Sequence, residues 1–195
     1  MKKNVFLFWS FLAASVIFFS CEKNDNRFGS KMNLKSDSSP EVINGCETAF
    51  ARKTSASHAY CFNTIDLDND GRPDFNRWGW SNGPLIEGTS TWYNLYAAAG
   101  QCDPDKGVIV GRMDVHYYDG TISIVMSVKS GYALDETHLY VGNEILPRMD
   151  NGKYTVAPGQ YPHSHDLDGA KADYYTIENV SGSIYIIMHA VVCPS

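Results

Sequence analysis

The sequence lacks several of the short motifs that identify common enzyme classes. It contains no His-Glu-x-x-His zinc motif and no glycine-rich loop of the kind that binds phosphate. It also has no Cys-x-x-Cys pair, which argues against a cysteine-based zinc site. We therefore expect a protein that is not an enzyme, with an envelope hydrolase as the weakest alternative.

Basic residues are few and scattered. The chain has 16 Lys and Arg against 22 Asp and Glu, for a net charge of −6 at pH 7. An acidic chain without a basic run is a poor ligand for nucleic acid, so we expect no nucleic-acid partner. The hydrophobic and aromatic contents, 44% and 13%, exclude a chain that is disordered throughout, a collagen and a coiled coil.

A short apolar segment follows a basic start at the N-terminus. Lys2 and Lys3 precede residues 5–19, which are almost entirely apolar. As a helix this segment would extend only about 22 Å, less than the ~30 Å of a bilayer core. We interpret residues 1–20 as a signal peptide rather than a membrane span.

The end of this segment reads Phe18-Phe19-Ser20-Cys21, with a small residue directly before a cysteine. The pattern resembles the lipobox of bacterial lipoproteins, although most lipoboxes have Leu and a small residue where this chain has Phe18 and Phe19. Lipoproteins of the Bacteroidota tolerate such departures. The resemblance implies that Cys21 is lipidated and anchors the protein in the outer membrane. The alternative is an ordinary secretory signal that is cleaved near Ser20.

Residues 21–44 are rich in Ser, Asn, Asp and Lys and show no apolar period, which is typical of a flexible tether. Neither an internal repeat nor a second linker follows. We expect one folded domain, residues 45–195.

The pattern of the domain is β. Residues 121–128 alternate between apolar and polar positions, and residues 108–118 form a second strand-like run. Asp119-Gly120 joins the two, and a two-residue Asp-Gly link between such runs predicts a hairpin. Many short strands with turn residues between them predict a single antiparallel β-sandwich, with a closed barrel as the alternative. The remaining predicted strands are 59–64, 75–80, 92–97, 138–141, 154–157, 174–180 and 184–193.

Four cysteines remain in the domain once Cys21 is set aside. They are Cys46, Cys61, Cys102 and Cys193, and an even number in an exported chain predicts two disulfides. Three pairings are possible. We favour Cys46–Cys193, which would join the two ends of the domain, with Cys61–Cys102 inside it.

A repeated acidic pattern predicts a calcium loop. Asp66, Asp68 and Asp70 alternate before Gly71, and the carbonyl of Arg72 and the side chain of Asp74 complete the ligand spacing of an EF-hand as far as its ninth position. The twelfth position is Arg77 instead of Glu, so the loop is not an EF-hand. We expect a structural calcium ion; the alternative is an acidic, solvated turn.

Five segments of the domain resemble a recurrent β-module of bacterial surface proteins. The resemblance spans nearly all of residues 46–193 and implies a secreted β-module without a particular activity. The segments are CETAFA at 46–51, RWGWSNGPL at 77–85, LYAAAGQCD at 95–103, GYALDETHLYVG at 131–142 and TVAPGQYP at 155–162.

Aromatic residues are concentrated in one stretch. Trp78 and Trp80 would share a face if that stretch is a regular strand, and Trp92 begins the next strand. An exposed group of tryptophans could stack on sugar rings or anchor a protein partner. If the rings are buried instead, they are core.

The segment His163-Ser164-His165-Asp166 contains the residue types of a catalytic or metal site. Neighbours in one loop rarely converge as a triad does, so we expect a polar surface loop after Pro162. As metal ligands, His163 and His165 would share one face of an extended chain, with His138 or His189 joining them.

These observations predict a lipid-anchored module of the cell envelope that binds a glycan or an envelope protein through its aromatic residues. A purely structural or assembly role is the alternative.

Overall fold

A computed structural model describes residues 43–195. The predicted signal peptide, Cys21 and nearly all of the tether lie outside this range. Ile43, which the sequence assigned to the tether, is only 6% exposed and packs in the core. The folded part therefore begins before residue 45, where the sequence predicted its start. Within the described range, no helix has the length and apolar character to cross a bilayer.

The described residues are all-β, as predicted. Five short 3-10 turns lie between strands: η1 (Ala56–His58), η2 (Phe62–Thr64), η3 (Gly100–Cys102), η4 (Pro104–Lys106) and η5 (Pro158–Gln160). The strands are β1 (Glu47–Arg52), β2 (Ala59–Cys61), β3 (Trp80–Leu85), β4 (Thr89–Ala97), β5 (Val108–Tyr118), β6 (Thr121–Val128), β7 (Tyr132–Gly142), β8 (His163–Ala170), β9 (Ala172–Ile177) and β10 (Ile184–Pro194).

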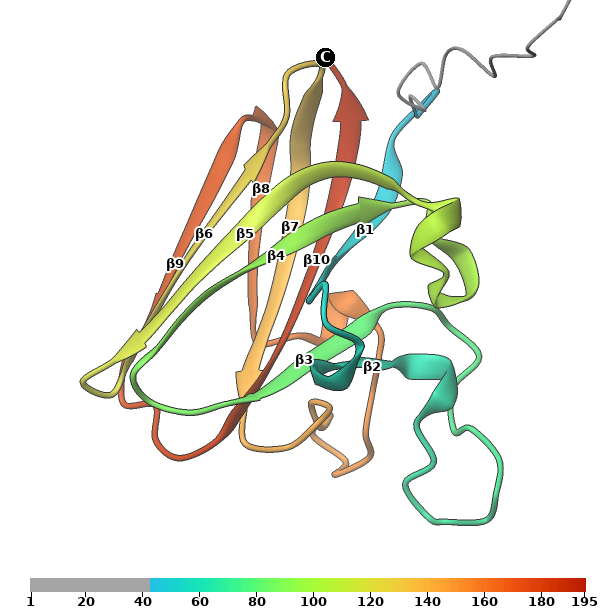
Figure 1. Ribbon diagram of the computed structural model, residues 1–195, viewed down its shortest axis with the longest axis vertical. Helices are drawn as coiled ribbons and strands as arrows, with labels where there is room; N and C mark the ends of the chain where they lie inside the picture. The colour runs from blue at the N-terminus through green and yellow to red at the C-terminus, as the bar shows by residue number, and fades with distance from the viewer. Residues whose placement is uncertain (1–42) are drawn as a thin grey trace, which may run out of the picture. The chain divides into compact units, whose positions relative to one another are not determined.

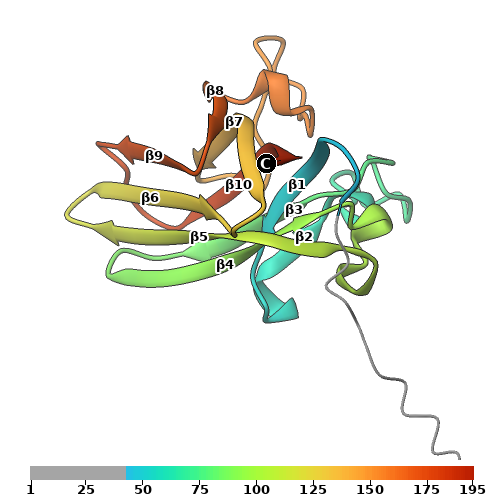
Figure 2. The ribbon, with the colours of Figure 1, turned by 90° about the horizontal axis from the view of Figure 1, so that it is seen from above.

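The strands form an antiparallel sheet that doubles back on itself as a sandwich. Strands β4, β5, β6 and β9 follow one another in one layer, and β10 pairs with β7, which pairs with β8, in the other. Strand β1 connects the layers because it pairs with both β10 and β4. Figure 1 shows the long strands side by side, and Figure 2 shows β7 and β10 lying over β4 and β5.

The β5–β6 hairpin has the predicted boundaries. Its register runs from Gly111 opposite Val128 to Tyr118 opposite Thr121. Asp119 and Gly120 both have positive φ, 51° and 68°, as the tight turn between twisted strands requires. Period-two patterning and turn chemistry agree here, and so the prediction is confirmed.

The hydrophobic core has two parts, one on each side of the layer that contains β10. The first part fills the sandwich and includes Leu95, Met113, Ile124 and Met188. The second lies on the outer face, beneath the connections that follow β2, β4 and β7. This second part, the outer core, contains Phe50, Phe62, Trp80, Tyr96, Leu146 and Ile187.

Four predicted segments differ in the structure. Of the predicted strand 59–64, only residues 59–61 are a strand (β2), and residues 62–64 form η2. Residues 75–80 are not a strand, because β3 begins only at Trp80, after Gly79 at φ 143°. Residues 154–157 form only an isolated bridge, between Tyr154 and Arg148. Residues 163–166 are the start of β8 rather than a loop, because they pair with β7 along one edge of the sheet.

Both disulfides have the favoured pairing. Cys46 joins Cys193, across 147 positions of sequence, and fastens β10 to the segment before β1. Cys61 joins Cys102 and links the end of β2 to η3. The second bridge lies beside Gly79, whose amide nitrogen is 3.5 Å from Cys102 Sγ.

Gly79 gives a direct test of the outer core. A Cβ at this position would lie 2.3 Å from Cε2 of Phe62, whereas a Cβ at Gly88, also at positive φ, would meet nothing within 4 Å. We expect Gly79→Ala to lower the free energy of unfolding by about 2–5 kcal/mol, from strain plus overpacking. The control Gly88→Ala should cost only about 1–2 kcal/mol, from strain alone. Equal losses in urea unfolding would contradict the packing described here.

Candidate functional site

A cleft opens on the outer face of the β1–β10–β7 layer. It consists of two adjoining cavities of about 690 and 730 Å³, which share the side chains of Asn63, Asn76, Arg77, Gln101 and Val156. Residues of β1, β7 and β10 form its floor, and the connection from β2 to β3 forms one wall. The residues come from many separate segments, so the cleft exists only in the folded chain.

The floor contains a row of three rings on adjacent strands. Phe50 of β1 is the register partner of His189 of β10, which is in turn opposite His138 of β7. The ring centroids are 5.0 Å apart for Phe50 and His189, and 5.4 Å apart for His138 and His189. Sheet register therefore fixes the spacing of the row.

The two floor histidines have different polar surroundings. Nε2 of His138 donates to Oε1 of Glu136 at 2.6 Å. His189 is 6% exposed, and among the described residues its Nδ1 has no hydrogen-bond partner. Burial, with a smaller effect from nearby His138, lowers the pKa of His189 to about 3. His189 is therefore neutral at pH 7.

Trp78 lies in the wall of the cleft, next to the floor. Its ring packs edge-on against Phe50, with centroids 5.2 Å apart, and against Trp80 at 5.8 Å. Trp78 is only partly buried and lines the cleft, so part of its ring is available to a ligand. Its neighbours hold it in place.

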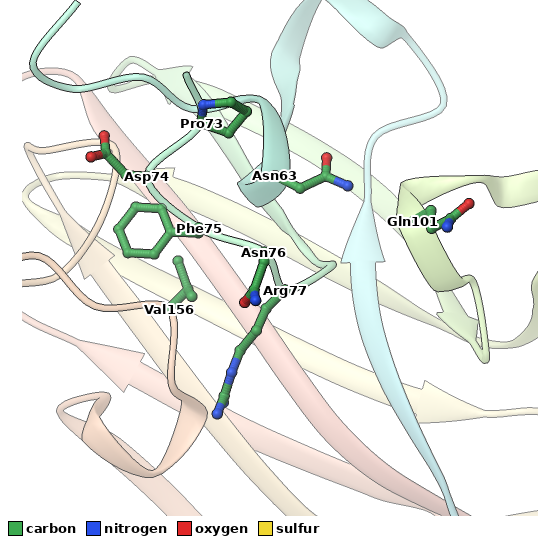
Figure 3. Close-up of a pocket in the computed structure, with 8 residues that line it drawn as sticks. All are labelled: Asn63, Pro73, Asp74, Phe75, Asn76, Arg77, Gln101 and Val156. Carbon is green, nitrogen blue, oxygen red and sulfur yellow. The ribbon is translucent and has the colours of Figure 1, made fainter. Parts of the chain in front are cut away.

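Polar side chains surround the other half of the cleft. Figure 3 shows Asn63 and Gln101 with Asn76 and Arg77, and the four come from three separate segments. Within residues 43–195, Arg77 makes no ion pair. Three carboxamides and a guanidinium can donate several hydrogen bonds, and the carboxamides can also accept them.

The Cys61–Cys102 bridge positions two of these polar residues. Asn63 lies in η2, two positions after Cys61, and Gln101 directly precedes Cys102. The amide of Phe62 donates to the carbonyl of Gly79 at 3.0 Å, which fixes the chain just before β3. One covalent bond and one backbone hydrogen bond thus hold both the amides and Trp78.

The three candidate tryptophans do not share one surface. Trp80 is 2% exposed and belongs to the outer core, with the guanidinium of Arg52 over its ring. Trp92 is 45% exposed on β4, under the guanidinium of Arg112, and does not line the cleft. Only Trp78 combines a packed position with a place in a cavity.

The acidic loop brings together three of its predicted ligands. One carboxylate oxygen from each of Asp66, Asp68 and Asp74 lies within 4.8 Å of the others. The carboxylate of Asp70 instead accepts from the amide of Arg72 at 2.8 Å. The loop leads directly into the cleft wall at Phe75.

His163 and His165 face Tyr175 at the edge between β8 and β9. The ring of His165 is stacked on that of Tyr175 at 4.4 Å, and its Nδ1 donates to the buried carboxylate of Asp173 at 2.9 Å. In register they flank Ser164, which is opposite His138, so their side chains lie on the other face of the sheet from His138 and His189. His138 and His189 form a separate pair.

Residues 79–83 read Gly-Trp-Ser-Asn-Gly, the spacing of a nucleophile elbow. An elbow presents its serine on a sharp turn between a strand and a helix. Ser81 is instead fully buried within β3, and its Oγ donates to the carbonyl of Ile145 at 2.6 Å. The segment is structural.

In comparison with known proteins, no family model, curated protein or solved structure matches this chain.

The buried histidine gives a prediction about pH. Because its native pKa is about 3 and its ordinary value is 6.5, the unfolded chain binds more protons between these limits. We expect the free energy of unfolding, measured in chelator, to fall by on the order of 3 kcal/mol from pH 6.5 to pH 4. His189→Gln should remove most of this slope, whereas His116→Gln, which replaces an exposed histidine of β5, should keep it. Parallel curves for wild type and His189→Gln would refute the assignment.

Proposed function

We propose that this protein is a lipid-anchored module of the bacterial cell envelope that binds a glycan in the cleft over β1, β10 and β7. The observation that supports this most directly is Trp78, whose partly exposed ring lines a cavity together with three carboxamides. Sugars present both apolar C–H faces and many hydroxyls. A ring beside amides matches that chemistry.

The shape of the cleft favours a glycan over a folded protein partner. Small or chain-like ligands bind in concave sites with a few convergent polar groups. Folded proteins usually bury about 800 Å² on each side of an interface, which requires a broader surface than this cleft. A purely structural role remains the alternative function, and it predicts no ligand for the cleft.

One observation favours the hydrolase alternative. Glu136, at the cleft floor, is the register partner of Asp166 on β8. Two neighbouring carboxylates are the catalytic groups of most glycosidases. In this chain, however, Glu136 already accepts from His138, which favours a binding site. Release of reducing ends from a bound oligosaccharide, lost in Glu136→Gln, would support the hydrolase instead.

Trp78 should dominate binding. We expect Trp78→Ala to weaken binding by about thirtyfold, or 2 kcal/mol, because a stacked aromatic ring is lost from a packed site. Trp92→Ala is the matched control, since it removes an exposed tryptophan outside the cleft, and should change affinity by less than about twofold. Calorimetry with cellohexaose, xylohexaose, chitohexaose and oligogalacturonate measures both variants.

Thermal unfolding accompanies this test because Trp78 also packs on Phe50. Trp78→Phe keeps much of that packing and should retain part of the affinity. If all four probes fail to bind the wild type, or if Trp92→Ala is the variant that loses binding, the cleft is not the glycan site.

We further propose that the acidic loop binds a structural calcium ion. Asp66, Asp68 and Asp74 provide hard oxygen ligands that converge from one loop, and backbone amides hold all three carboxylates in place. A bound ion would also offset the repulsion among the carboxylates. Because the loop continues into Phe75 and Trp78, calcium would stabilise the cleft wall.

Calcium should raise the melting temperature. At one hundred times its dissociation constant, a ligand specific to the native state adds about 2.7 kcal/mol of stability. Asp68→Asn should abolish this gain, whereas Asp70→Asn should retain most of it, since the Asp70 side chain points to the Arg72 amide. Identical wild-type melting curves in calcium and in chelator would exclude the ion.

The membrane anchor rests on the sequence alone. We expect Cys21→Ala to abolish incorporation of labelled fatty acid and to release the protein from the membrane fraction, because no acyl chain would then hold it. Ser20 and the rest of the signal peptide stay unchanged in this variant. Membrane association that persists without Cys21 would refute the lipoprotein assignment.

A further inference from the structure

Two histidines lie directly opposite each other in the cleft floor. His138 of β7 and His189 of β10 are register partners, and their ring centroids are 5.4 Å apart. Both rings lie on the face that lines the cleft. Neighbouring residues at such positions have Cβ atoms only about 5 Å apart, so one ion can contact both side chains.

The ring spacing fits a shared metal ion. A tetrahedral ion about 2.1 Å from one nitrogen of each imidazole places the two ring centroids roughly 5–5.5 Å apart. The observed 5.4 Å falls within that range. Sheet register therefore sets the two rings at a separation that suits a shared ion.

Each ring also has one nitrogen left for a ligand. Nε2 of His138 donates to Glu136, so this ring's lone pair is on Nδ1. A carboxylate behind a metal-binding imidazole is the usual arrangement that orients such a ligand. Nδ1 of His189 is buried and, within the described range, has no partner. An orphaned buried nitrogen is costly, and coordination would satisfy it.

We propose that the cleft floor binds a divalent transition-metal ion, Zn²⁺ or Cu²⁺, between Nδ1 of His138 and Nδ1 of His189. Glu136 is a positioning residue that fixes the ring of His138. Water, or a hydroxyl of a ligand bound in the cleft, would complete the coordination of the ion. The nitrogen ligands select these ions over Ca²⁺, which prefers oxygen.

The site is distinct from two other places within residues 43–195 that contain metal-binding residue types. The Asp66–Asp68–Asp74 group offers only carboxylates, and His163 and His165 lie at the β8 edge, with Nδ1 of His165 already bonded to Asp173. Each of these two groups can be removed by substitution without changing a residue of the cleft floor. They provide the controls for the test.

The experiment is calorimetry of the purified protein with Zn²⁺, with Cu²⁺ and with Ca²⁺, followed by electron paramagnetic resonance of the Cu²⁺ form. We expect one Zn²⁺ site that His138→Gln or His189→Gln weakens at least about tenfold. Glu136→Gln should weaken Zn²⁺ binding by about tenfold or more while two nitrogen couplings remain in the Cu²⁺ spectrum, as a positioning role requires. His116→Gln, Asp68→Asn and the double variant His163→Gln/His165→Gln should bind Zn²⁺ as the wild type does.

Three results would overturn the proposal. They are the absence of Zn²⁺ binding to the wild type, binding that survives His138→Gln but not His163→Gln/His165→Gln, and a Cu²⁺ spectrum without coupling to two imidazole nitrogens. The spectrum is recorded on the wild type, so it decides the question even if His189→Gln does not fold. Glycan binding is not required for any of these measurements.

Discussion

The burial of β10 on both faces is the constraint on which the rest of this structure depends. Its inward side chains, among them Ile186, Met188 and Ala190, fill the space between the two layers. Its outward side chains, Ile187 and His189, lie beneath the connections on the other side. A strand covered on both faces is nearly continuously apolar, and residues 184–192 show this pattern. His189 is the polar exception, and the cleft lies above it.

The outer core lies beneath a cover of irregular segments, the connections that follow β2, β4 and β7, and these segments need specific contacts to hold them in place. Loops without regular pairing lose much conformational entropy on ordering. Here the Cys61–Cys102 bridge, the Phe62 amide bonded to Gly79 and the close approach of Gly79 to the Phe62 ring restrict the cover. The same contacts position Asn63, Trp78 and Gln101. The contacts that stabilise the cover are therefore the same ones that set the geometry of the site.

Local patterns predicted those parts of the fold that local physics determines. The β5–β6 hairpin follows from alternation plus Asp119-Gly120, and the favoured disulfide pairing is the one observed. Residues 75–80 look like a strand because they are rich in aromatic residues. In the structure, Gly79 packs against the ring of Phe62, and β3 begins only at Trp80. The acidic loop was visible as a motif, although the hydrogen bond between the Asp70 carboxylate and the Arg72 amide was not.

The cleft could not be predicted in this way, because its residues are assembled by sheet register and loop packing. His138 and His189 are 51 positions apart and become neighbours only through the pairing of β7 with β10. One signal was present: a single histidine inside the apolar run of residues 184–192. A polar side chain there has to face either a partner or a cavity.

The most direct test of the central claim, that the cleft over β10 is the ligand site, is a nuclear magnetic resonance titration of the indole N–H signals. With the tightest-binding of the four oligosaccharides, the signal of Trp78 should shift most, with smaller changes at its neighbour Trp80 and none at Trp92. Backbone amides of Asn63, Asn76 and Gln101 should shift with it. A titration that moves Trp92 and leaves Trp78 unchanged would contradict the account.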